Sequence, residues 1–331
     1  MRKLFSSTTA FVAGLVLVAI VGALLILPSN DYIFLPDEAH PVAPLVTVPG
    51  GRDPTKGGIY YVDVIVRKAH LIERLFGGIH EGADLYPASA INPPGGGEQE
   101  RRQIDLEDMQ NSQQVAAAVA LRAAGKPVIT TPIGAKVEQV FLQAPAVGKL
   151  DPDDIITAID GVPIKTRADV IAAMAKHKAG DTVAFTIRRG RTTRVVTIKT
   201  IAEPSTGRAI VGISLDDAVD IHLPVDVMIN AGDVGGPSAG LAFALDILQE
   251  LGRNIVRGHK IAATGEILPD GSVGAIGAVK QKTIGARRAH VDAFLVPAGE
   301  NAQEARRYAH GLRIIAVKNF PQALRALATL R

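Results

Sequence analysis

An unbroken run of apolar residues, from Phe11 to Leu27, stands out near the N-terminal end of the chain. No charged residue lies between Lys3 and Asp31. A helix that crosses a bilayer needs about 20 mostly apolar residues, so the pattern predicts a transmembrane helix over residues 11–28. A cleaved signal peptide is the alternative, although its apolar region would be unusually long and no small-residue cleavage site follows it.

The charges before this run predict its orientation. Arg2 and Lys3 precede it, and basic flanks stay on the cytoplasmic side of a membrane. We therefore expect a cytoplasmic tail at residues 1–10. The rest of the chain would lie outside the cytoplasm, in a single-pass protein of the cell membrane with an extracellular body.

The body alternates between strand-like and helix-like patterns, which predicts an α+β fold. Residues 29–58 are rich in Pro, Gly and polar turn residues. β-Branched and aromatic residues then mark a strand at 59–66. A run rich in Ala, Leu and Gln, closed by Gly125, marks a helix at 105–124.

Residues 127–200 predict a small mixed domain, in which turn residues separate short apolar runs. Its predicted elements are strands at 137–141, 154–159, 182–187 and 194–199 and a helix at 168–177. The pattern changes from residue 203 onward, where a strand at 225–229 leads into a glycine-rich loop and a helix at 239–251.

Composition removes several classes of function. The chain of 331 residues has no Cys, which excludes disulfides, thiolate metal sites and a cysteine nucleophile. It has no Trp and only 4% aromatic residues, so a nucleic-acid binder built on base stacking is not expected. No H-E-x-x-H or Walker A motif occurs, and we expect neither a metal nor a cofactor.

The segment from Gly232 to Gly240 is the most informative for chemistry. Its glycines let the backbone bend tightly, and Ser238 stands at the start of an apolar helix. Unpaired N–H groups at a helix N-terminus can stabilise an oxyanion formed beside that serine. A simple N-cap serine is the alternative. A hydrolase elbow is disfavoured, because the preceding strand-like run ends well before the serine, at Ile229.

A serine nucleophile needs a base, and the chain offers a lysine on an apolar helical stripe. Lys282 follows Val279 by three residues and precedes Ala286 by four, which places it on the buried face. Lys280 projects to the polar side instead. Burial lowers the pKa of a lysine, so Lys282 fits a Ser–Lys dyad, with a snorkelling stem as the alternative.

Together these segments resemble the proteolytic domain of Lon proteases, and the resemblance extends over residues 203–331. A helix with Met109-Gln110-Asn111-Ser112 is similar to one that precedes the catalytic part in that family. The matching motifs, in chain order, are Gly236-Pro237-Ser238-Ala239-Gly240, Thr264-Gly265-Glu266-Ile267, Ile276-Gly277-Ala278-Val279-Lys280-Gln281-Lys282, and Pro297 with Asn301.

The resemblance implies roles for individual residues. Ser238 would be the nucleophile and Lys282 its base, with Thr264 near the lysine and Gly236 and Pro237 shaping the serine loop. The sequence departs from many Lon proteins directly before this motif. Gly235 stands where they carry an acidic residue, and Asp233 is the nearby acid.

The inserted segment resembles a PDZ domain, a module that binds extended peptides at a sheet edge. The segments that carry the resemblance are Ala144-Pro145-Ala146, Gly148-Lys149-Leu150, Asp154-Ile155-Ile156, Ile159-Asp160-Gly161 and Arg188-Arg189-Gly190. The resemblance implies a peptide-binding loop at Ile133, Gly134, Ala135 and Lys136, although this loop departs from the usual form.

The whole arrangement is similar to the membrane-anchored PDZ–Lon proteases of bacteria, which have no ATPase module. It implies an N-terminal part of the Lon-like domain at 43–125, a PDZ-like domain at 127–202 and a catalytic part at 203–331. The expected function is an ATP-independent serine endopeptidase that cleaves exported or membrane-associated peptides and proteins. Its partners would be those substrates and the membrane, with no nucleic acid and with oligomerisation possible. The alternative is a non-catalytic PDZ scaffold that binds membrane-protein tails.

Overall fold

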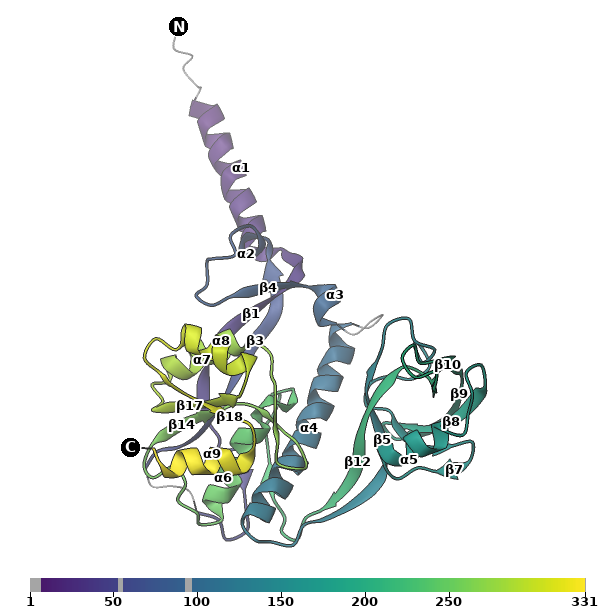
Figure 1. Cartoon of the computed structure of the whole chain (residues 1–331). Helices are drawn as coiled ribbons and strands as arrows, with labels where there is room; N and C mark the ends of the chain where they lie inside the picture. The colour runs from purple at the N-terminus through teal and green to yellow at the C-terminus, as the bar shows by residue number, and fades with distance from the viewer. Residues whose placement is uncertain (1–6, 53–55, 93–96, 331) are drawn as a thin grey trace. The chain divides into compact units, whose positions relative to one another are not determined.

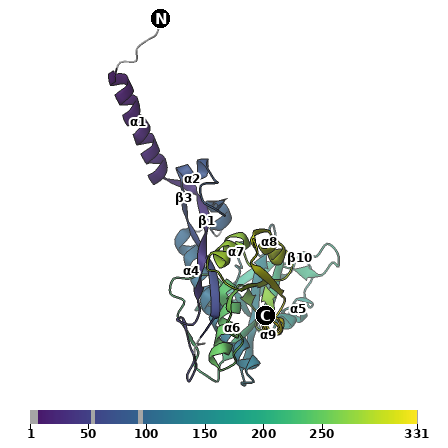
Figure 2. The same ribbon diagram turned by 90° about the vertical axis from the view of Figure 1, so that its left-hand side faces the viewer.

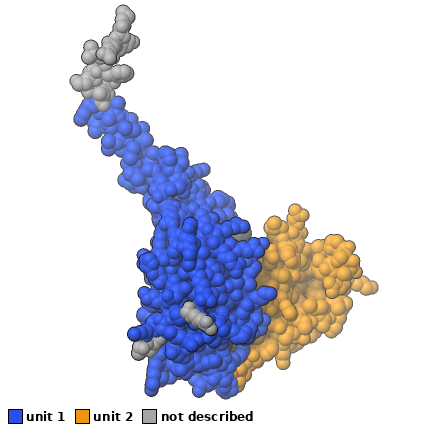
Figure 3. Space-filling model, turned by 60° about the vertical axis from the view of Figure 1, so that its left-hand side comes forward, with its two compact units in different colours: residues 1–127, 223–331 blue, residues 128–222 orange. Residues whose placement is uncertain are grey.

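The computed structural model describes residues 7–52, 56–92 and 97–330. The chain divides into two compact units, coloured separately in Figure 3. Unit 1 comprises residues 1–127 and 223–331, and unit 2 comprises residues 128–222. The chain therefore leaves unit 1 once, forms unit 2, and returns to complete unit 1.

Unit 1 contains most of the helices and a large sheet (Figure 1). Before unit 2 its elements are α1 (Ser7–Ile26), β1 (Pro28–Pro41), β2 (Val46–Thr47), β3 (Gly58–His70), α2 (Leu71–Leu75), β4 (Asp84–Pro87), α3 (Ala88–Ile91) and α4 (Glu98–Ala123). After unit 2 they are β13 (Met228–Ile229), the 3-10 turn η1 (Pro237–Ala239), α6 (Gly240–Glu250), β14 (Lys260–Ala263), β15 (Glu266–Ile267), β16 (Val273–Gly274), α7 (Val279–Arg288), β17 (Ala293–Pro297), α8 (Glu300–Tyr308), β18 (Arg313–Val317) and α9 (Phe320–Ala328).

The sheet of unit 1 has the strand order β18-β17-β14-β3-β1-β4. The strands from β18 to β3 run parallel, whereas β1 pairs antiparallel with both β3 and β4. Figures 1 and 2 show the long strands β1 and β3 side by side. The sheet therefore joins strands that precede unit 2 in the chain with strands that follow it. Strand β3 comes before unit 2 and pairs with β14, which comes after it.

Both faces of the sheet are covered, and the residue alternation of the strands explains how. On β14, Ile261 and Ala263 belong to a core that includes helices α4, α6 and α9, whereas Ala262 belongs to a second core with α7 and α8. Strand β17 divides in the same way, with Leu295 on one face and Phe294 on the other. Burial on both faces accounts for the continuous apolar sequence of β17.

Helix α7 approaches the sheet so closely that only glycine fits at one position. A Cβ atom on Gly285 would lie 1.9 Å from the carbonyl oxygen of Asp37 in β1. This contact fixes the height of α7 above the sheet, and therefore fixes the position of the side chains that α7 carries.

The N-terminal helix α1 contains most of the segment predicted to span a membrane, residues 11–28. Within the described part of the chain, no helix combines the length and the apolar content that a membrane crossing requires. The predicted tail at 1–10 lies largely outside the described residues. The helical part of the prediction thus has a counterpart in the structure, and the membrane-spanning part is unsupported.

Unit 2 is built on its own sheet and its own core. The strand order is β12-β5-β6-β8-β9, with β7 paired to β6, and a separate ribbon joins β10 to β11. The elements are β5 (Ile129–Val140), β6 (Ile155–Ile159), β7 (Val162–Pro163), α5 (Arg167–Met174), β8 (Thr182–Arg189), β9 (Thr192–Lys199), β10 (Ile201–Ala202), β11 (Ala209–Ile210) and β12 (Ile213–His222).

The boundaries of this unit differ from those expected for the PDZ-like domain at 127–202. Strand β12 pairs with β5 over nearly its whole length, from Ile213 opposite Val140 to His222 opposite Ile129. Residues 203–222 therefore belong to unit 2, and the catalytic part of unit 1 resumes at residue 223. The N-terminal part of unit 1 also begins before residue 43, because β1 lies within its sheet.

Candidate active site

Ser238 lies in the 3-10 turn η1, directly before α6. The glycines at the two ends of the motif around Ser238 each have a structural role. Gly236 adopts a φ of 82°, a conformation that other residues rarely take. A Cβ atom on Gly240 would lie 2.6 Å from Oγ of Ser112, so this glycine lets α6 pack directly against α4. Every residue of α6 is buried, which holds the serine on a rigid element.

Three hydrogen bonds fix the backbone at Ser238. The carbonyl oxygen of Ser238 accepts from the amide of Gly265 at 2.8 Å and from Oγ1 of Thr264 at 3.2 Å. Oγ of the buried Ser112 donates to the carbonyl oxygen of Pro237 at 2.9 Å. Thr264 is fully buried, so it holds the backbone of Ser238 from within the core. Three of the segments matched in the sequence, those that contain Ser112, Ser238 and Thr264, thus meet at one turn.

Lys282 reaches Ser238 from α7 on the other side. Its Nζ donates to Oγ of Ser238 at 2.6 Å, and its side chain is only 5% exposed. Burial lowers the pKa of Lys282 from 10.5 to about 8, and the negative charge of Asp63 partly opposes this. At neutral pH the neutral fraction is then roughly 300-fold larger than for an ordinary lysine.

Lys280 points elsewhere, as the helical spacing predicts, but it does not extend freely into solvent. Its Nζ donates to Oδ1 of Asp84 at 2.6 Å and to the carbonyl oxygen of Ala83 at 3.2 Å. Gln281 binds the other oxygen of Asp84 at 2.8 Å. These two side chains attach α7 to β4, so Lys280 supports the helix that carries Lys282.

The loop before α7 is held by Asn301. The Oδ1 atom of Asn301 accepts from the amide of Ile276, and its Nδ2 donates to the carbonyl of the same residue, both at 2.9 Å. Ala278 then begins α7 in a left-handed conformation, with a φ of 57°. Asn301 therefore acts on the lysine through the loop and the helix start.

A cavity of about 800 Å³ in unit 1 opens onto the dyad. Besides Ser238 and Lys282, acidic residues from β3 and α4, Asp63 and Asp105, line it. Neither acid was predicted from the sequence to be a site residue. An acid in the middle of the apolar run at 59–66 was a visible signal for Asp63, whereas nothing in the helix pattern distinguished Asp105.

Asp233 does not replace the acid that Gly235 lacks. Its side chain is 89% exposed and pairs with Arg102 at 2.8 Å. A Cβ atom on Gly235 would lie 2.8 Å from that of Asp105, so the close approach of α4 requires glycine there. Asp105 also accepts a hydrogen bond from the amide of Gly236 through its carbonyl oxygen, at 2.7 Å.

A mixed group of ionisable side chains lies beside the cavity. One side-chain nitrogen or oxygen atom from each of Asp37, His40 and Asp63 lies within 4.8 Å of the corresponding atoms of the other two. The Nε2 atom of His40 is 3.4 Å from Oδ2 of Asp37 and 4.0 Å from Oδ1 of Asp63. The two carboxylates and the imidazole therefore lie close enough for their charges to act on one another.

The residues predicted to bind peptide in unit 2 form part of a strand. Ile133, Gly134, Ala135 and Lys136 lie inside β5, which pairs with β12 on one side and with β6 at Ala135 and Lys136 on the other. Ala135 is fully buried.

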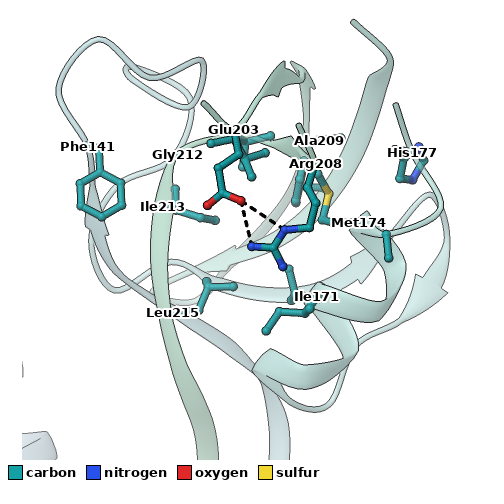
Figure 4. Close-up of a pocket in the computed structure, with 15 residues that line it drawn as sticks. Phe141, Ile171, Met174, His177, Glu203, Arg208, Ala209, Gly212, Ile213 and Leu215 are labelled. Carbon is teal, nitrogen blue, oxygen red and sulfur yellow. Dashed lines mark hydrogen bonds and ion pairs between the residues drawn. The ribbon is translucent and has the colours of Figure 1, made fainter. Parts of the chain in front are cut away.

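Unit 2 instead has an apolar cavity of about 610 Å³ between α5 and the strands β11 and β12 (Figure 4). Ile171 and Met174 line it from α5, and Ile213 and Leu215 line it from β12. An ion pair between Glu203 and Arg208, at 2.9 Å, also borders it. Its apolar walls and few polar groups are typical of a peptide or ligand site.

Comparison with known proteins supports both parts of this description. Residues 211–329 match the family model of the Lon protease (S16) C-terminal proteolytic domain, and residues 104–200 match that of the PDZ domain. The chain therefore contains a Lon-type proteolytic domain of a serine peptidase family together with a PDZ domain. The PDZ match begins within α4 and ends before β12, whereas unit 2 extends from 128 to 222.

Individual relatives match over shorter stretches. The Lon protease of Buchnera aphidicola subsp. Schizaphis graminum is 38% identical over 109 residues, which are 32% of this chain and 14% of that protein. The Lon protease of Porphyromonas gingivalis is 26% identical over 204 residues, or 54% of this chain and 24% of that protein. The chain thus spans only a small part of the length of these relatives.

Among solved structures, the PDZ domain of the SdrC-like protein of Listeria monocytogenes is 32% identical. The match covers 25% of this chain and 87% of that chain, with a TM-score of 0.24, a value too low to carry an argument about the fold.

We expect the rate at which a fluorophosphonate phosphonylates Ser238, with loss of fluoride, to rise with pH and to level off above the pKa of Lys282, about 8. The reason is that only neutral Lys282 can accept the hydroxyl proton. Labelling rates measured across pH on the folded chain check this. Lys282→Met should lower the plateau by roughly 100-fold or more.

Lys280→Met is the matched control, since this lysine is on the same helix but binds Asp84. It should keep the midpoint of the wild-type profile. A loss of labelling in Lys280→Met that Lys282→Met does not show would contradict the assignment of the base.

Proposed function

We propose that this chain is an ATP-independent serine endopeptidase in which Ser238 is the nucleophile and Lys282 the general base. The observation that carries the proposal is the 2.6 Å contact between Nζ of Lys282 and Oγ of Ser238, with the lysine buried and its pKa lowered to about 8. A serine hydroxyl is a weak nucleophile until an adjacent base removes its proton, and this contact supplies one.

The chemistry follows from the two atoms in contact. Neutral Lys282 accepts the proton of the Ser238 hydroxyl as Oγ attacks a peptide carbonyl. Backbone N–H groups around Ser238 would stabilise the oxyanion. Protonated Lys282 then gives its proton to the leaving amine, and water hydrolyses the acyl-enzyme by the same route in reverse.

The proposal includes independence from nucleotide because the sequence contains no Walker A motif. Without an unfolding motor, substrates would be short, flexible or already unfolded. The alternative of an inert scaffold does not require a lysine held against a serine at a buried site. The intact contact therefore favours an enzyme.

Purified full-length chain should cleave unfolded β-casein in the presence of EDTA and without nucleotide. Ser238→Ala should reduce the rate by roughly 1,000-fold or more, because it removes the atom that forms the acyl-enzyme. Circular dichroism of the variant controls for folding. Cleavage that appears only with ATP and magnesium would contradict independence from nucleotide, and equal cleavage by Ser238→Ala would contradict the dyad.

Unit 2 would select substrates through the apolar cavity between α5 and β12. Its lining residues suit apolar side chains of an extended peptide, and the edge of β12 near Ile213 lies beside the cavity. The dyad lies wholly in unit 1, so recognition and chemistry would be separable by substitution.

Replacing Ile171, whose side chain lines the cavity, tests whether unit 2 selects substrates while the dyad in unit 1 cleaves them. Ile171→Asp should reduce cleavage of an unfolded peptide library severalfold, since it places a charge against apolar walls. Fluorophosphonate labelling of Ser238 should remain at the wild-type rate. Ala172→Asp is the matched control, because Ala172 is exposed on α5 and does not line the cavity. Unchanged library cleavage by folded Ile171→Asp would remove unit 2 from substrate selection.

We further propose that the N-terminal segment attaches the chain to the cell membrane, with the body on the outer side. The sequence at 11–27 is apolar and uncharged, and α1 exposes many of its large apolar side chains, among them Phe11 and Val18 at 69%. Exposed apolar surface of this kind calls for a lipid or protein partner. The substrates would then be exported or membrane-associated proteins.

Flotation of the full chain with lipid vesicles tests the attachment. Val18→Arg should weaken binding strongly, because a charge in the middle of an apolar segment costs about 2.5 to 3.5 kcal/mol in a bilayer. Val195→Arg, on an exposed position of β9, should bind as the wild type does. Since the chain has no Cys, a single Arg325→Cys would report the side of the membrane by its reaction with an impermeant maleimide. Labelling only after permeabilisation would contradict an outer-side body.

A further inference from the structure

Asp63 lies where its charge acts on Lys282. It belongs to β3 and lines the same cavity as Ser238 and Lys282. Its negative charge favours the protonated form of Lys282, and the positive charge of Lys282 favours the ionised form of Asp63. The two groups are coupled in both directions, although they come from different elements of the fold.

Whether Asp63 is ionised depends on its burial and on the charges beside it. Its Oδ1 is shielded from solvent and has no hydrogen-bond partner among the described residues. Burial raises the pKa of Asp63, and the neighbouring charge of Asp37 raises it further. His40, whose Nε2 lies 4.0 Å from Oδ1 of Asp63, lowers the pKa of Asp63 and so opposes both effects. The charge of Asp63 therefore depends on the two residues that β1 places beside it.

Other ionisable groups near the cavity are already paired or neutral. Tyr61 stands on the same strand, and its pKa is raised by burial and by the charges of Asp63 and Asp37, so it stays neutral. On α4, Arg101 pairs with Asp105 at 3.1 Å. The remaining charged groups that line the cavity are Glu98 and the pair of Arg102 with Asp233.

We propose that Asp63, held between His40 and Asp37, is a positioning residue that acts through Lys282 and sets the pH range in which the dyad reacts. When Asp63 is ionised, its negative charge favours protonated Lys282, and a protonated lysine cannot act as the base. When Asp63 takes up a proton, that restraint is lost and Lys282 becomes neutral more readily. The charge state of Asp63 thus shifts the acid side of the activity profile.

This inference rests on the proposed dyad, so the experiment needs one readout that requires no catalysis. The first readout is the NMR titration of Lys282 through its ¹³Cε signal, assigned by comparison with Lys282→Arg. The second is the pH profile of fluorophosphonate labelling. All measurements use the full chain in EDTA, so that stray metal ions at the cluster do not contribute.

Asp63→Asn should lower the titration midpoint of Lys282, and the acid limb of the labelling profile, by about 0.5 to 1 pH unit. The sign follows because a charge that favours protonated lysine has been removed. Asp63→Glu should stay close to the wild type. Asp37→Asn should move the midpoint upward or leave it in place, since Asp63 then stays ionised to lower pH.

Asp84→Asn is the matched control, because Asp84 also binds α7 but through Lys280 and Gln281. It should leave both midpoints unchanged. A uniform loss of labelling in Asp63→Asn, with no shift of either midpoint, would overturn the proposal and leave Asp63 a structural residue. If Asp63→Asn fails to fold, a downward shift in Asp37→Asn would overturn the proposal equally. A shifted NMR midpoint in a chain that no probe labels would instead contradict the dyad while sustaining the role of Asp63.

Discussion

The burial of one amino group against one hydroxyl is the constraint on which the rest of unit 1 depends. An ammonium taken out of water is unstable unless it is paired or gives up its proton. Lys282 has a serine hydroxyl as its contact and a carboxylate only at longer range, so burial lowers its pKa to about 8 and raises the share of the neutral amine. The fold must hold this arrangement rigidly, since a free lysine would turn toward solvent.

The rigidity comes from both sides of the contact. Gly285 lets α7 lie directly on β1, and Asn301 fixes the loop from which α7 begins. On the serine side, Gly240 lets α6 pack against α4, and Thr264 holds the carbonyl of Ser238. The elements that bring these residues together come from both segments of unit 1, which explains why the chain must return after unit 2 to complete the site.

The motifs around Ser238 and Lys282 predicted the dyad, and periodicity predicted which lysine of α7 is buried. The spacing around Lys282 predicted its buried face, and the structure shows that side chain to be 5% exposed. Strand β1 could not be predicted, because its sequence, with three prolines and several acidic residues, becomes a strand only through long-range pairing with β3 and β4. Asp63 was missed for a related reason, since its effect on Lys282 exists only once β3 and α7 share a cavity. Strand β12 could not be assigned to unit 2 from the sequence, because it pairs with a strand that precedes it by more than 70 residues, at Ile129 and Val140.

The central claim is that Ser238 forms a covalent acyl intermediate with the help of Lys282. Its most direct test is to quench a reaction of the full chain with a peptide ester in acid and to map the adduct by mass spectrometry. The account predicts an acyl group on the peptide that contains Ser238, and no such adduct in Lys282→Met. Turnover of the ester without any adduct, or with the acyl group on another residue, would contradict it.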